Sequence, residues 1–143
     1  MSRWIVDASL SLGWYLIDEQ DRAYNLEVLA GLKGNEAVVP FLWTYEVSNG
    51  LAMAQRRKRI TNEDLTEIMK SLEALPIAVD PPDAGSVWQL PALALKHQLT
   101  VYDAAYLELA LRLALPIATK DEALKRAMKS CGVQAVQPGS STN

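Results

Sequence analysis

The feature that most constrains the fold is the alternation of short apolar runs with longer stretches of helical periodicity. The runs at residues 3–6, 37–39, 77–79 and 116–119 have the length and composition of buried strands, and residues 133–136 could add a fifth. Parallel strands need a crossover connection, which is usually a helix. The sequence therefore predicts an α/β fold, a three-layer α/β/α domain with a mostly parallel central sheet of four or five short strands.

Helices are expected between these strands, because apolar residues recur there at helical spacing. The predicted helices cover residues 9–17, 21–32, 42–58, a segment starting at 61, and residues 87–99, 103–115 and 122–129. Thr61 followed by Asp64 is the pattern of a capping box. Trp4 and Trp43 are expected in the core, and Trp14 and Trp88 are expected to pack against the core or a subunit.

Length and composition indicate one ordinary globular domain. We expect residues 1–137 to form it and residues 138–143, with the sequence PGSSTN, to be a flexible tail. The one cysteine, Cys131, is compatible with a reducing compartment. The sequence has no signal-peptide pattern and no apolar run that could span a membrane, so we expect a cytoplasmic protein without membrane contact.

The net charge argues against bulk electrostatic binding of nucleic acid. It is −3 at pH 7, so such a function would need a local basic patch or a bound metal. The run Arg56, Arg57, Lys58 and Arg59 is the obvious candidate patch. It could stabilise the C-terminal end of a helix dipole, contact an RNA backbone, or do both.

Acidic residues follow the predicted strands in a repeated pattern. Asp7 comes directly after the first strand, Glu46 lies in the helix after the second, and Asp121 comes two residues after the fourth. Asp103 stands at the start of the preceding helix. If the strands are parallel, Asp7, Glu46 and Asp121 are expected at one edge of the sheet, and Asp103 reaches that edge if its helix starts there.

Each acid also has a simpler structural interpretation. Asp7 and Asp121 are suited to cap the helices that follow them, and Asp103 could be the acidic partner of Thr100 in a capping box. Glu46 lies in the middle of a helix, where capping does not apply. Carboxylates brought close together raise one another's pKa unless a cation neutralises them. An all-oxygen ligand set favours Mg²⁺ or Mn²⁺, whereas a lone His97 and a lone cysteine make a poor zinc site.

Four segments in order resemble the PIN domain family, and specifically the VapC-type toxin ribonucleases. They are IVDAS at 5–9, PFLWTYEVSNGL at 40–51, LTVYDAAYLELALRL at 99–113 and LPIATKDEAL at 115–124. The resemblance implies an acidic pocket built from Asp7, Glu46, Asp103 and Asp121. It also implies supporting polar positions at Ser9, Asn49 and Thr119. It further implies a homodimer and a VapB-type antitoxin protein that wraps the toxin and obstructs its pocket.

The expected function is metal-dependent hydrolysis of RNA phosphodiester bonds. Asp7, Glu46 and Asp103 are the leading metal ligands, and Asp121 would hold a second ion or orient the attacking water. Water attack would leave a 5′-phosphate. The alternative with two catalytic histidines is disfavoured, because the chain has one.

Three other functions fit parts of the same pattern. A haloacid-dehalogenase-like phosphotransferase would need a second Asp two residues after the first, where Ser9 stands. A receiver domain would need a phosphorylated Asp after the third strand, and Asp80, followed by Pro81, fits that poorly. A non-catalytic PIN-fold binding module is the third alternative, and the intact acids argue against it.

Overall fold

The computed structural model describes residues 1–18, 22–81 and 83–137. The expected tail and the predicted helix start at Asp21 lie outside these ranges, as does Pro82. The strands are β1 (Arg3–Val6), β2 (Glu36–Pro40), β3 (Ile77–Asp80) and β4 (Ile117–Ala118). The helices are α1 (Ala8–Leu12), α2 (Arg22–Gly31), α3 (Phe41–Arg56), α4 (Asn62–Ala74), α5 (Ala84–His97), α6 (Val101–Leu113) and α7 (Glu122–Cys131).

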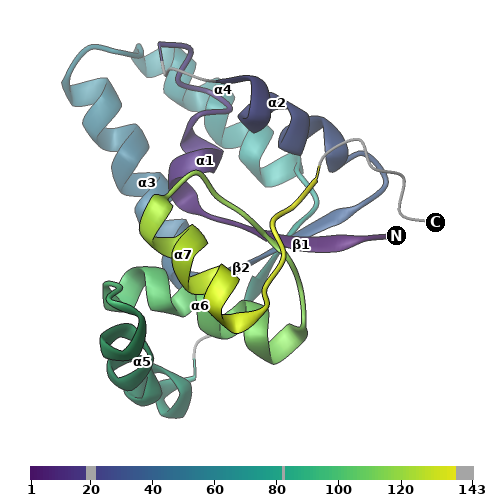
Figure 1. Cartoon of the computed structure of the whole chain (residues 1–143). Helices are drawn as coiled ribbons and strands as arrows, with labels where there is room; N and C mark the ends of the chain where they lie inside the picture. The colour runs from purple at the N-terminus through teal and green to yellow at the C-terminus, as the bar shows by residue number, and fades with distance from the viewer. Residues whose placement is uncertain (19–21, 82, 138–143) are drawn as a thin grey trace.

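The four strands form one parallel sheet in the order β3-β2-β1-β4. In Figure 1, α1 and α2 and then α3 and α4 connect successive strands on one side of the sheet, and α5, α6 and α7 lie on the other side. The connection from β3 to β4 runs back across the sheet, so the direction of winding reverses between β1 and β4. This arrangement confirms the predicted α/β class, and the reversal creates the place where open parallel sheets bind ligands.

The core consists of the central strands and the helix faces that cover them. Ile5, Val39 and Ile117 of the sheet are fully buried, as are Leu107 and Leu109 of α6. On α3 the apolar stripe is also buried within the chain; its members are Trp43, Val47, Leu51 and Ala54. That stripe is therefore core and is not available to a partner protein.

The first predicted helix is longer in the sequence than in the structure. The pattern predicts residues 9–17, but α1 ends at Leu12 and residues 13–15 form turns. Gly13 is buried against Asn25 of α2, and a Cβ atom there would lie 2.0 Å from the Asn25 side-chain nitrogen. Tertiary packing of α2 against the turn thus overrides local periodicity.

The predicted fifth strand is not formed as a strand. Residues 133–136 contact β4 through a single parallel bridge between Ile117 and Ala135, with two backbone hydrogen bonds. β4 itself has two residues, so it offers little length for pairing.

Three of the four tryptophans are buried as expected. Trp4, Trp14 and Trp43 are 7%, 4% and 6% exposed, whereas Trp88 on α5 is 79% exposed and does not pack on the chain's own core. None of the helices in the described ranges has the length and apolar character needed to cross a membrane.

Candidate active site at the carboxyl edge of the sheet

Asp7 is a buried carboxylate placed where β1 ends and α1 begins. Its Oδ1 accepts a hydrogen bond from the backbone N–H of Leu10 at 2.8 Å, so the expected helix cap is formed. Its Oδ2 accepts a hydrogen bond from the Thr119 hydroxyl. Burial raises the pKa of Asp7 to about 6, opposed by these two hydrogen bonds and reinforced by Asp103 and Asp121. Asp7 therefore caps α1 and also interacts with other acidic side chains.

The hydroxyl of Thr119 connects the ends of two neighbouring strands. It donates to Asp7 and accepts the backbone N–H of Asp121 at 3.0 Å. Asp121 is exposed, and it caps α7 by accepting from the backbone N–H of Leu124 at 2.8 Å. Pairing of β1 with β4 thus brings the first and last acids of the chain to the same edge of the sheet.

Glu46 and Asp103 reach this edge from helices on opposite sides of the sheet. The buried hydroxyl of Tyr106 on α6 donates to Oε1 of Glu46 on α3 at 2.7 Å. Burial raises the pKa of Glu46; the Tyr106 hydrogen bond lowers it and Asp103 raises it. Burial also raises the pKa of Asp103, and Asp121 adds to this effect, opposed by the Thr100 hydroxyl.

The four predicted acids form one electrostatic group with Asp103 at its centre. The charge of Asp103 acts on Asp7 and on Glu46, and Asp103 in turn responds to Asp121. Within the described ranges, no three acidic, histidine or cysteine side chains stand close enough together to hold a metal ion as a ready cluster. Mg²⁺ commonly binds through one or two carboxylates and keeps several waters, so this donor set fits a hydrated hard cation.

Two of the supporting positions make no hydrogen bond to this group in the part of the chain that the structure describes. They are Ser9 and Asn49, whose side chains are exposed. Thr119, the third supporting position, is buried within the group.

The basic run lies at the far end of α3 from Phe41, beyond Glu46. Arg56 is the last residue of the helix, Arg57 is its C-cap, and Lys58 has a left-handed φ of 62°. Arg59 differs from the others, because its guanidinium binds Asp18 through bonds of 2.8 and 2.6 Å. The run is exposed, as an RNA contact requires, but one of its cations is already engaged by a carboxylate.

Sequence reasoning missed the residues that hold the acids in place. Tyr106 follows Asp103 by three positions, so helical spacing alone puts both on one face of α6. Ser11 donates from its hydroxyl to the backbone oxygen of Asp7 at 2.8 Å and accepts from the Trp43 indole at 3.0 Å. The i+3 spacing could have revealed Tyr106; the link between Trp43 and Ser11 has no signal in the sequence.

Known proteins are similar to this chain in sequence and in fold. The PIN domain family model matches residues 4–129. Ribonuclease VapC3 of Pyrobaculum aerophilum is 33% identical over 127 residues, which cover 84% of this chain and 90% of that protein.

Two crystal structures share the fold at lower identity. PAE2754 from Pyrobaculum aerophilum has a TM-score of 0.61 and 24% identity, over 94% of this chain and 84% of that one. FitAcB from Neisseria gonorrhoeae has a TM-score of 0.61 and 17% identity, over 94% and 96% of the two chains. With the family model covering most of its length, this chain belongs to the PIN domain family and is of the VapC type.

Proposed function

We propose that this protein is a metal-dependent endoribonuclease, a VapC-like toxin that hydrolyses RNA phosphodiester bonds at the acidic site. The observation that supports the proposal is the electrostatic coupling among four carboxylates: Asp103 raises the pKa of Asp7 and of Glu46, and Asp121 raises the pKa of Asp7 and of Asp103. The similarity to a protein named ribonuclease supports the reaction class. The pKa values of Asp7, Glu46 and Asp103 are raised, and a cation would stabilise such carboxylates in their charged form.

Asp7, Glu46 and Asp103 would hold Mg²⁺ or Mn²⁺, directly or through water. When bound, the ion lowers the pKa of a coordinated water and stabilises charge on the phosphate. Thr119 keeps the Asp7 carboxylate oriented, and Tyr106 does the same for Glu46. Asp121 is exposed beside them and would orient the attacking water or hold a second ion.

The basic run would contribute to substrate binding at a distance from the cut bond. Arg56 lies ten residues after Glu46 on the same helix, about 15 Å along its axis. Arg56, Arg57 and Lys58 can therefore contact the RNA backbone beyond the acids. Arg59 would contribute less, because Asp18 engages it.

We further propose a VapB-type antitoxin as the inhibiting partner, a homodimer, a cytoplasmic location and a single domain over residues 1–137. The homodimer proposal has support on α5. Trp88 and Leu95 are 79% and 82% exposed, and their spacing of seven residues puts them on one face of the helix. Large exposed apolar side chains of this kind mark interaction surfaces. Light scattering on the wild type and on Trp88→Ser tests whether this surface forms a homodimer.

The test of the nuclease proposal is cleavage of structured and unstructured RNA by the purified chain, with Mg²⁺, with Mn²⁺ and with a chelator. Asp7→Asn should abolish cleavage while leaving the circular dichroism spectrum unchanged. Glu63→Gln is the matched control, because Glu63 is an exposed acid in the first turn of α4, away from the site. Products should carry a 5′-phosphate; a 2′,3′-cyclic phosphate, or full activity of Asp7→Asn, contradicts the mechanism.

The same assay separates the alternatives. A non-catalytic PIN-fold module would bind RNA without cutting it in any metal. A haloacid-dehalogenase-like enzyme would release phosphate from a small phosphorylated substrate and leave RNA intact.

A further inference from the structure

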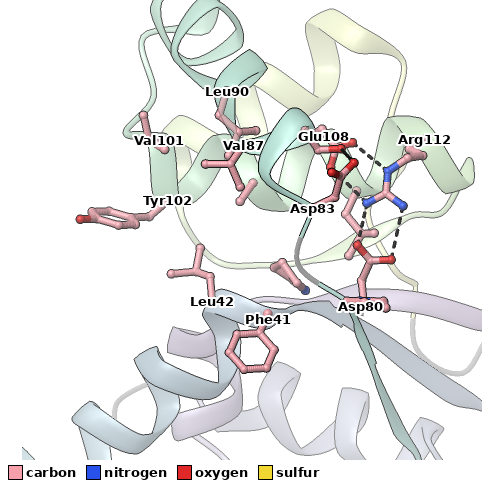
Figure 2. Close-up of a pocket in the computed structure, with 15 residues that line it drawn as sticks. Phe41, Leu42, Asp80, Asp83, Val87, Leu90, Val101, Tyr102, Glu108 and Arg112 are labelled. Carbon is pink, nitrogen blue, oxygen red and sulfur yellow. Dashed lines mark hydrogen bonds and ion pairs between the residues drawn. The ribbon is translucent and has the colours of Figure 1, made fainter.

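A concave site lies on the same edge of the sheet as the acids. It is a pocket of about 420 Å³, within the range of small-molecule sites. Its apolar walls come from the start of α3, from α5 and from the start of α6 (Figure 2). The residues forming those walls are Phe41, Leu42, Val87, Leu90, Val101 and Tyr102.

The pocket and the acidic site share two helices. On α6, Tyr102, Ala105, Leu109 and Arg112 face the pocket, spaced as one helical stripe. Asp103 follows Tyr102 by one position. It is therefore turned by about 100° around the helix axis, toward the other three acids. On α3, Leu42 lines the pocket and Glu46 stands four residues later, about 6 Å along the axis. A group bound in the pocket is thus about one helical turn from the acids.

One end of the pocket is polar and acidic. Figure 2 shows the Arg112 guanidinium between Asp80 and Glu108, with Tyr102 at the opposite end. Arg112 donates to Asp80 at 2.7 Å and to Glu108 at 2.8 Å, so both carboxylates engage its charge. Asp83 adds a third carboxylate, held by the N–H of Gly85 and the hydroxyl of Ser86. Three acids against one arginine leave this end negative.

This charge balance determines what the pocket can take. A phosphate group is repelled, and an uncharged, flat group with hydrogen-bond donors is favoured at the acidic end. The aromatic side chains at the mouth of the pocket can stack against the face of a planar ring. Tyr102 is 62% exposed and Phe41 is 41% exposed. Phe41 is also held edge-on against Tyr45, whose ring centroid lies 5.7 Å away.

We propose that this pocket binds a nucleobase of the RNA substrate, one that flanks the cut bond and carries an exocyclic amino group. The inference rests on the proposed ribonuclease function and names a recognition subsite for it. The apolar walls and Tyr102 hold the ring, and the amino group donates to the carboxylates at the acidic end. Adenine, cytosine and guanine carry this group and uracil does not, so uracil binds most weakly.

A direct binding test does not depend on catalysis. The probes are the four ribonucleosides, which lack phosphate, titrated into the ¹⁵N-labelled chain with a chelator present. Amide shifts should move at residues 101–109 and 83–90 with adenosine, cytidine and guanosine, and at least threefold less with uridine. Val87→Trp, which fills the pocket from α5, should abolish these shifts. Leu111→Trp is the matched control: it has the same 45% exposure, lies on α6 and does not line the pocket.

Cleavage of an RNA library provides the second readout. The wild type should prefer an amino-bearing base at one position next to the cut, and Val87→Trp should lose at least tenfold in rate on preferred sites and flatten that preference. Asp83→Asn keeps a residue that caps α5 equally well and should reduce discrimination against uracil.

The outcomes distinguish this inference from the function on which it rests. If the wild type cleaves RNA and Asp7→Asn does not, yet nucleosides leave the pocket unshifted or Val87→Trp keeps the preference, the subsite is refuted and the nuclease stands. If Val87→Trp instead changes the mass by light scattering with preference intact, the pocket is a protein interface, which also overturns the proposal. If no RNA is cut in any metal, the nuclease proposal fails, whatever the nucleosides do.

Discussion

The hydroxyl of Tyr106 on α6 hydrogen-bonds Glu46 on α3, across the carboxyl edge of the sheet and 60 residues away in sequence. This contact changes the pKa of both side chains. The hydrogen bond lowers the pKa of Glu46 against the effect of burial, while burial and Glu46 together raise the pKa of Tyr106. Tyr106 therefore remains a donor, and it helps to keep Glu46 ionised in a half-buried position.

Tyr106→Phe should slow RNA cleavage by about tenfold near pH 6 and by less at pH 8.5. Without the hydroxyl, the pKa of Glu46 rises, so a larger fraction is protonated at the lower pH. The measurement is the pH profile of kcat/KM, whose acidic limb should move to higher pH. Tyr15→Phe is the control, because its hydroxyl bonds Ser71 instead of an acid. A uniform loss of rate at every pH would mean that Tyr106 acts only on packing.

Asp7→Asn should make the metal-free protein more stable at pH 7.5, by up to about 3 kcal/mol. The pKa of Asp7 is raised from 3.8 to about 6, so between these pH values the folded chain holds more protons than the unfolded chain. Its free energy of unfolding therefore falls as pH rises through that window, and the contribution is fully lost above it. Asn keeps the helix cap without the buried charge.

Urea unfolding with a chelator, at pH 7.5 and at pH 4, checks this. The difference between Asp7→Asn and the wild type should vanish at the lower pH, and added Mg²⁺ should stabilise only the wild type. A variant less stable than the wild type at both pH values would show that Asp7 is required for packing.

Thr119→Val should destabilise the protein by about 1–3 kcal/mol at pH 8, because it removes a donor from a buried carboxylate. It also leaves the Asp121 N–H without its side-chain acceptor. Thr119→Ser retains the hydroxyl and should recover most of the loss. Thermal unfolding followed by circular dichroism measures both; a Val variant as stable as the Ser variant would show that the hydroxyl does not stabilise the site.

The combined variant Arg56→Ala, Arg57→Ala and Lys58→Ala should weaken RNA binding more at low salt than at high salt. Each lost phosphate contact reduces the slope of log K against log salt by about 0.7 for single strands. Binding is measured in the Asp7→Asn background, so that the RNA stays intact. Arg59→Ala should change the slope much less, because that guanidinium is bound to Asp18. An unchanged slope in the combined variant excludes the contact.

The sequence was informative wherever a local pattern and the tertiary contacts agree. The strand at Arg3–Val6 was predicted with both ends correct, because an apolar run there ends at a residue that caps the next helix. Thr61 and Asp64 form both hydrogen bonds of the predicted capping box. Parallel strand order predicted that Asp7, Glu46 and Asp121 would lie toward one edge of the sheet, whereas the place of Asp103 depended on where α6 begins.

The rest depended on contacts between distant residues. The helix after Asp7 was predicted too long, because nothing local shows that Asn25 packs against Gly13. The charge balance of the pocket depends on Arg112 meeting Asp80, which is 32 residues away. Trp88 shows a second limit of the sequence: nothing in the local pattern indicates that this apolar residue on a helix is exposed.

Pairing of β1 with β4 has a consequence for the order of biosynthesis. Asp7 is made first, but its partner Thr119 and the acid Asp121 emerge from the ribosome when most of the chain has been translated. Until Ile117–Ala118 joins the sheet, Asp7 has neither its hydroxyl donor nor its neighbouring carboxylate. A nascent or truncated chain that lacks β4 therefore carries an incomplete acidic site.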